Sequence, residues 1–155
     1  MKKTIVALFT SVIFVISAQA ALVENPGDAA KKVDEFGNIN CEGEMARLDA
    51  FAQMLQNSPD SIGYIIIYGG SKGKRNEAKA RAARMAYYLT KARGVDTAKV
   101  KTIDGGYRKT LSGEFWLAMP GDEAPKASPT IDAKSVKLKG TEKIRGYSCG
   151  STMGT

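Results

Sequence analysis

The stretch from Tyr64 to Leu89 reads YIIIYGGSKGKRNEAKARAARMAYYL, and its pattern predicts the centre of the fold. Its first five residues, Tyr64 to Tyr68, form a continuous run of β-branched and aromatic side chains, as expected of a strand buried on both faces. Gly69, Gly70 and Gly73 then interrupt the run and allow a tight turn with positive φ. The sequence therefore predicts a buried strand that ends in a glycine turn.

A helical period replaces the strand pattern from about Arg75 to Arg93. Apolar residues recur there at three- and four-residue steps and predict one narrow apolar stripe, which consists of Ala78, Ala82, Met85, Leu89 and Ala92. Its small alanines allow the helix to lie close against a sheet. Gly94 is expected to end the helix in the left-handed conformation. The strand, turn and helix together make half of a split β-α-β unit.

The remaining segments complete an α+β pattern. Alternation predicts an edge strand over 33–39, and a helix over 43–57 has its apolar face at Met45, Leu48, Ala52 and Leu55. Short strands are expected at 100–103 and 113–119, separated by a turn at 104–108. We expect strands 64–68, 100–103 and 113–119 to share a small mixed sheet, with both helices packed on one of its faces.

The chain has 155 residues, which favours one domain after an N-terminal targeting segment. Lys2 and Lys3 precede an apolar stretch, and Ala18-Gln19-Ala20 has the form that signal peptidase cuts. The alternative is an uncleaved anchor helix. We predict a signal peptide at 1–20, a folded domain at 21–121, and a linker and tail at 122–155, with a further strand possible near 136–139. The mature protein is expected to be periplasmic or secreted and to have no transmembrane segment.

The formal net charge is +7, and the basic residues are concentrated. Residues 72–93 hold eight lysines and arginines and one acid, Glu77. An exported basic protein meets anionic lipids, lipopolysaccharide and peptidoglycan rather than nucleic acid. The alternative interpretation is that the run is a solvated helix face.

Two cysteines, Cys41 and Cys149, and the absence of histidine limit the chemistry further. In an exported chain the pair predicts one disulfide, with two free thiols as the alternative. Zinc is not expected, because only two soft ligands exist. No catalysis and no cofactor are expected, since the common general base is missing and Ser71 has no base beside it.

Binding is better supported by the sequence than catalysis. The start of the second helix presents backbone N–H groups beside Lys72, Lys74 and Arg75, which favours a carboxylate or phosphate. Arg81 lies about two turns further along the helix. Tyr107 and Arg108 follow the next strand, and in a split β-α-β sheet they would reach the same edge as the helix start.

Residues 33–119 resemble the C-terminal peptidoglycan-binding domain of outer-membrane protein A. Residues 81–89 (RAARMAYYL) resemble the R-A-x-x-V-x-x-Y-L segment of that family, and residues 94–100 (GVDTAKV) resemble its G-[IV]-x-x-x-[KR]-[IV] loop. Residues 46–49 resemble the start of its first helix. The resemblance implies an OmpA-like fold and a site that holds peptidoglycan.

The resemblance also implies which residues form the site. Family members hold diaminopimelate with an aspartate after the central strand and with the arginine of R-A, which Arg81 matches. Asn76 is the counterpart of the motif's asparagine. The aspartate is absent, because Tyr68 runs directly into glycines. The expected site is therefore cationic and favours anions over the ammonium group of diaminopimelate.

These observations predict a non-catalytic envelope protein that binds peptidoglycan or another anionic component. The alternative is a protein–protein interaction module that has lost peptidoglycan binding. For Arg81 itself the competing interpretation is structural, with an ion pair to a nearby acid such as Glu77.

Overall fold

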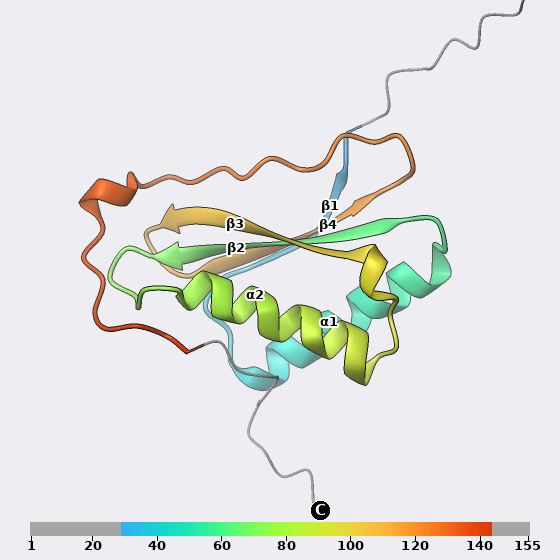
Figure 1. Ribbon diagram of the computed structural model, residues 1–155, viewed down its shortest axis with the longest axis horizontal. Coiled ribbons are helices and arrows are strands. Elements are labelled where there is room, and N and C mark those ends of the chain that lie inside the picture. The colour runs from blue at the N-terminus through green and yellow to red at the C-terminus, as the bar shows by residue number, and fades with distance from the viewer. Residues whose placement is uncertain (1–28, 144–155) are drawn as a thin grey trace, which may run out of the picture.

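The computed structural model describes residues 29–143 and has an α+β fold. Its four-stranded mixed sheet has the order β1-β4-β2-β3. The strands are β1 (Lys31–Phe36), β2 (Ile62–Gly70), β3 (Val100–Arg108) and β4 (Ser112–Ala118). Helices α1 (Cys41–Asn57) and α2 (Glu77–Tyr87) lie side by side on one face of this sheet (Figure 1). The predicted fold class, with both helices on one face, is confirmed.

The pairing of β2 defines the split β-α-β unit. It runs parallel to β3, to which α2 connects it, and antiparallel to β4, while β1 pairs antiparallel with β4 on the far side. Ile65, Ile66 and Ile67 are fully buried, so the central strand is covered on both faces as predicted. The expected edge strand near residue 33 is also present, as β1.

The core lies between the helices and the sheet. Ile65 and Ile67 of β2 pack there with the predicted apolar faces of both helices, including Leu48 from α1 and Met85 from α2. Phe51 of α1 stacks on Phe115 of β4 with ring centroids 4.7 Å apart. A fully buried aliphatic or aromatic side chain contributes roughly 1.5–3 kcal/mol, so this cluster is the main stabilising element of the fold.

The turn predicted at 104–108 is wrong, because these residues continue β3. A register shift opposite residues 67–69 inserts a bulge into the strand. A Cβ at Gly105 would lie 2.5 Å from Cδ1 of Tyr68, and Gly106 has a φ of 73°. The two glycines therefore serve close packing and a bulge within a strand rather than a turn.

The second helix is shorter at both ends than the predicted 75–93. Asn76 precedes it in the left-handed conformation with a φ of 62°, which asparagine tolerates better than most residues. A π-helical turn over Tyr88–Ala92 follows α2. Gly94 then has a φ of 68°, so its predicted left-handed conformation is confirmed.

The expected linker lies against the domain as far as the structure describes it. It runs along the sheet on the side opposite the helices (Figure 1), where the Ser128 backbone N–H donates to the Tyr68 hydroxyl at 3.1 Å. The Lys137 and Lys139 N–H groups then donate to carbonyls of Ser71 and Gly73. Residues 136–139 thus pair with the glycine turn without forming a strand of the sheet.

Two sequence predictions fall outside the described residues. The signal peptide at 1–20 is one of them, and Cys149 is the other, so the disulfide with Cys41 stays a prediction. Within residues 29–143 no helix is long and apolar enough to cross a membrane.

Candidate anion-binding cleft

A cleft of about 90 Å³ lies where α2 begins and where the parallel strands β2 and β3 end. Arg75, Asn76 and Tyr107 line this cleft together. The sequence placed Arg75 and Asn76 at the start of a helix and Tyr107 in a separate turn. They meet because parallel neighbours end at the same sheet edge, and because the bulge in β3 sets Tyr107 opposite Gly69. Three of the six predicted ligand-binding residues therefore share one site.

The electrostatic character of this cleft is mixed but leaves positive charge exposed. Arg75 and Lys79 are exposed, and neither forms an ion pair with another residue of the range 29–143. Two acidic residues also line the cleft, and both accept hydrogen bonds from the backbone. Asp104 accepts from the Gly106 N–H at 2.9 Å, and Glu77 accepts from the Lys74 N–H at 3.3 Å. The N-terminal end of the α2 dipole adds positive potential. Arg75 and Lys79 are therefore the groups of the cleft that can meet a small anion, while Glu77 and Asp104 keep their negative charges.

Lys74 also lines the cleft, but its ammonium group forms an ion pair with the tail. Its Nζ lies 2.8 Å from Glu142 Oε2, and this hydrogen bond raises the pKa of Lys74 above its usual range. The backbone of Glu142 is held there as well, since its N–H donates to the Arg75 carbonyl at 2.8 Å. The tail therefore brings a carboxylate to the mouth of the cleft.

Arg81 lies away from the cleft, between α2 and α1. It is only 7% exposed, and its Nε donates to Oε2 of Glu44 at 2.8 Å. Another guanidinium nitrogen donates to the Ile39 carbonyl at 3.3 Å, and Arg84 contacts the same Glu44 carboxylate at 3.4 Å. The acid that pairs with Arg81 is thus Glu44 rather than Glu77. This geometry favours a structural role for Arg81.

Arg108 and Lys72 also lie apart from the cleft residues. Arg108 is on the face opposite the helices, where its guanidinium lies 3.5 Å above the Tyr68 ring and donates to Glu114 at 2.7 Å. Burial acts to lower the pKa of Arg108, but the hydrogen bond to Glu114 and nearby negative charge raise it overall. Lys72 is exposed and is not among the residues that line the cleft.

The sequence analysis missed the two buried carboxylates, Glu44 and Glu114, each 2% exposed. Glu114 accepts hydrogen bonds from the Tyr68 hydroxyl at 3.1 Å and from the Trp116 indole at 3.0 Å. A usable signal was present for Glu114, because it interrupts a strand whose neighbours are apolar. For Glu44 the signal was its spacing of four residues before Leu48, on the buried face of α1.

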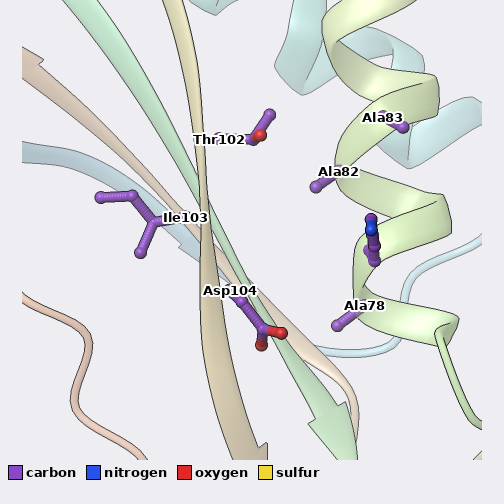
Figure 2. A pocket seen from close by; sticks show the side chains of 7 residues that line it. Ala78, Ala82, Ala83, Thr102, Ile103 and Asp104 are labelled. Atoms are coloured by element: carbon purple, nitrogen blue, oxygen red, sulfur yellow. The ribbon is translucent and has the colours of Figure 1, made fainter.

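A second and larger hollow adjoins the cleft. It has a volume of about 350 Å³ and lies between α2 and β3, where Ala78 and Ala82 face Thr102 and Asp104 (Figure 2). Ala83 also lines it. The two hollows share Ala78, Lys79 and Asp104, so they form one groove along the outer side of α2. No group of three or more histidine, cysteine, aspartate or glutamate side chains within residues 29–143 is placed to hold a metal ion.

Comparison with known proteins finds no family model that matches this chain and no curated protein that matches it. The resemblance to the OmpA-like domain therefore stays a prediction.

Proposed function

We propose that the protein is a non-catalytic binding protein of the cell envelope, which takes an anionic component such as peptidoglycan at the cleft where α2 begins. The observation that carries this proposal is the meeting of Arg75, Asn76 and Tyr107 at one helix N-terminus. Arginine offers a planar fork of donors to a carboxylate, and tyrosine adds a hydroxyl. Peptidoglycan presents free carboxylates on its peptides, and the basic chain favours encounter with such a polymer.

The cleft is small, which limits what it holds. A volume of about 90 Å³ admits a carboxylate or phosphate group but not a whole sugar. We therefore propose that the polymer is held by a terminal anionic group while the remainder lies along the adjoining groove. The OmpA-like resemblance supports the same class of ligand, peptidoglycan. The group that is contacted would differ, because the aspartate that would meet an ammonium group is absent.

Co-sedimentation with purified peptidoglycan sacculi tests the proposal. Arg75→Ala should remove most of the bound fraction, and added salt should weaken binding by the wild-type protein, because the contacts are exposed. Lys72→Ala and Lys91→Ala are matched controls: each removes one exposed positive charge outside the cleft and should retain most of the binding. Equal losses in all three variants would reduce the proposal to nonspecific charge attraction.

Export is part of the proposal and has its own test. The mature protein should begin at Ala21 and should be recovered from the periplasm or the medium, which N-terminal sequencing of each fraction measures. Protein that keeps residues 1–20 would indicate the uncleaved anchor. Intact mass after alkylation, with and without reductant, tests the Cys41–Cys149 disulfide in the same material.

A protein–protein interaction module is the second candidate. One observation favours it, namely that β3 is an edge strand with a groove beside it. An exposed sheet edge is a template for pairing with another chain.

A further inference from the structure

Within the described range 29–143, the outer edge of β3 is paired only at one end. At its C-terminal end the Tyr107 carbonyl accepts from the N–H groups of Thr130 and Ile131 at 3.0 and 3.1 Å, which makes an isolated antiparallel bridge. Within residues 29–143 no other segment pairs with the outer edge from Val100 to Asp104. The described part of the chain thus uses this edge to bind an extended segment and leaves Val100 to Asp104 without a strand on that side.

The groove beside α2 lies along the open part of this edge. Thr102 and Asp104 pair with the core-facing Ile65 and Ile67, so they belong to the face that carries the helices. Figure 2 shows both side chains toward α2 and Ile103 directed away from it. A strand added about 4.8 Å beyond β3 would direct alternate side chains over the alanines of α2. The volume of about 350 Å³ is room for such side chains.

The two faces of an added strand would meet different surfaces. On the helix side the groove is lined by Ala78, Ala82 and Ala83, which favours apolar side chains. On the other side stand Lys101 and Ile103, which pair with Tyr64 and Ile66. Lys101 is exposed and forms no ion pair with another residue of the described part of the chain. An acidic side chain across from Lys101 would complete the pairing.

We propose that the open edge of β3 binds an extended segment of a partner protein by strand addition. The segment alternates apolar residues, which enter the groove beside α2, with acidic residues, which face Lys101. Backbone hydrogen bonds supply the affinity and the alternate side chains supply the specificity. The chain's own Ile131 bridge shows the same mode of pairing on the same edge. The peptide would enter the groove into which the polymer proposed above extends, but its binding needs none of the cleft residues Arg75, Asn76 and Tyr107.

The probe is a fluorescent seven-residue peptide of alternating valine and glutamate with both ends blocked, measured by anisotropy against the full mature chain. We expect saturable binding, together with slower amide exchange at residues 100–104. A peptide methylated at every backbone nitrogen, which can donate a hydrogen bond along neither of its edges, should not bind. No binding by the first peptide, or equal binding by both, would overturn the proposal.

Charge exchange provides the specificity test. Lys101→Glu should weaken binding of the valine–glutamate peptide about fivefold or more. It should strengthen binding of a valine–lysine peptide, because unlike and like charges across a strand pair have opposite effects. Lys109→Glu makes the same charge change at an exposed loop residue and should alter neither affinity. Equal effects of the two variants would overturn the assignment of Lys101.

Two further results separate this site from its alternatives. Arg75→Ala should leave peptide binding intact even where it removes sacculus binding, so the two proposals fail independently.

Light scattering should show a monomer. A dimer whose residues 100–104 are protected from exchange would assign the edge to a second copy of this chain and would overturn the proposal of a peptide partner.

Discussion

The basic residues around α2 divide into two regions with opposite environments. Toward α1, Arg81 and Arg84 surround the buried carboxylate of Glu44. At the start of the helix, Arg75 and Lys79 are exposed and line a cleft. A run of positive charge in a sequence is therefore not one surface. Burial and the acid brought by a distant element decide which cations stabilise the fold and which can meet a ligand.

The largest effect is expected from removing the acid of the buried region. Glu44→Ala would leave the buried Arg81 without its counter-ion, and breaking a buried pair in this way costs about 3–5 kcal/mol. Chemical denaturation followed by circular dichroism measures the change. Glu42→Ala is the matched control, because Glu42 lies in the same first turn but is exposed. It should change the free energy of unfolding by about 1 kcal/mol or less. Similar values for the two variants would refute a structural role for the Glu44 cluster.

A smaller loss is expected at the other buried carboxylate. Glu114→Gln keeps the size of the side chain but removes the charge that meets Arg108, which should cost about 1–3 kcal/mol. The Trp116 fluorescence should change as well, because its indole donates to the same carboxylate. Glu123→Gln removes a charge at an exposed position of the tail and serves as the control. An unchanged transition in Glu114→Gln would show that the network adds little to stability.

The smallest effect is expected at low pH from exposed ion pairs such as the one between Asp49 and Arg93. The hydrogen bond from Arg93 holds the pKa of Asp49 below its usual value. Such a group stabilises the folded state above its unfolded pKa of about 3.9, and this contribution is lost as the pH falls through the folded pKa. The free energy of unfolding should therefore decline below about pH 4. Arg93→Gln should make the decline shallower, which denaturation at a series of pH values measures. The same slope in the wild-type protein and in Arg93→Gln would show that Asp49 does not cause the decline in stability.

The fold was largely predictable because its signals are local. The buried run was confirmed from Ile65 to Tyr68, and the predicted apolar stripe was confirmed at Ala82, Met85 and Leu89. Ala92 is the exception, because it is exposed at the end of the π-helical turn. The error at residues 104–108 arose because glycine has two physical uses. Gly105 is needed for close contact with Tyr68 within a strand, and the sequence alone cannot tell that use from a turn.

The site was less predictable because ion pairing depends on distant elements. Arg75, Asn76 and Tyr107 were placed together from the assumed topology. The partner of Arg81 is 37 positions away along the chain, on the other helix. Arg108 directly follows Tyr107 in β3, so its side chain points to the opposite face, where it donates to Glu114. The prediction of a turn at 104–108 left this alternation out, and no spacing rule within α2 could have supplied the partner of Arg81.

We propose that the cations of the cleft bind the ligand and that the buried arginines stabilise the fold. Sacculus affinity and thermal midpoint, measured side by side for Arg75→Ala and Arg81→Ala, separate these two roles. Each variant is measured at a temperature where circular dichroism shows folded protein. We expect Arg75→Ala to lose affinity at an unchanged midpoint and Arg81→Ala to lose several degrees while retaining affinity. Loss of affinity in Arg81→Ala at an unchanged midpoint, with binding intact in Arg75→Ala, would contradict the account.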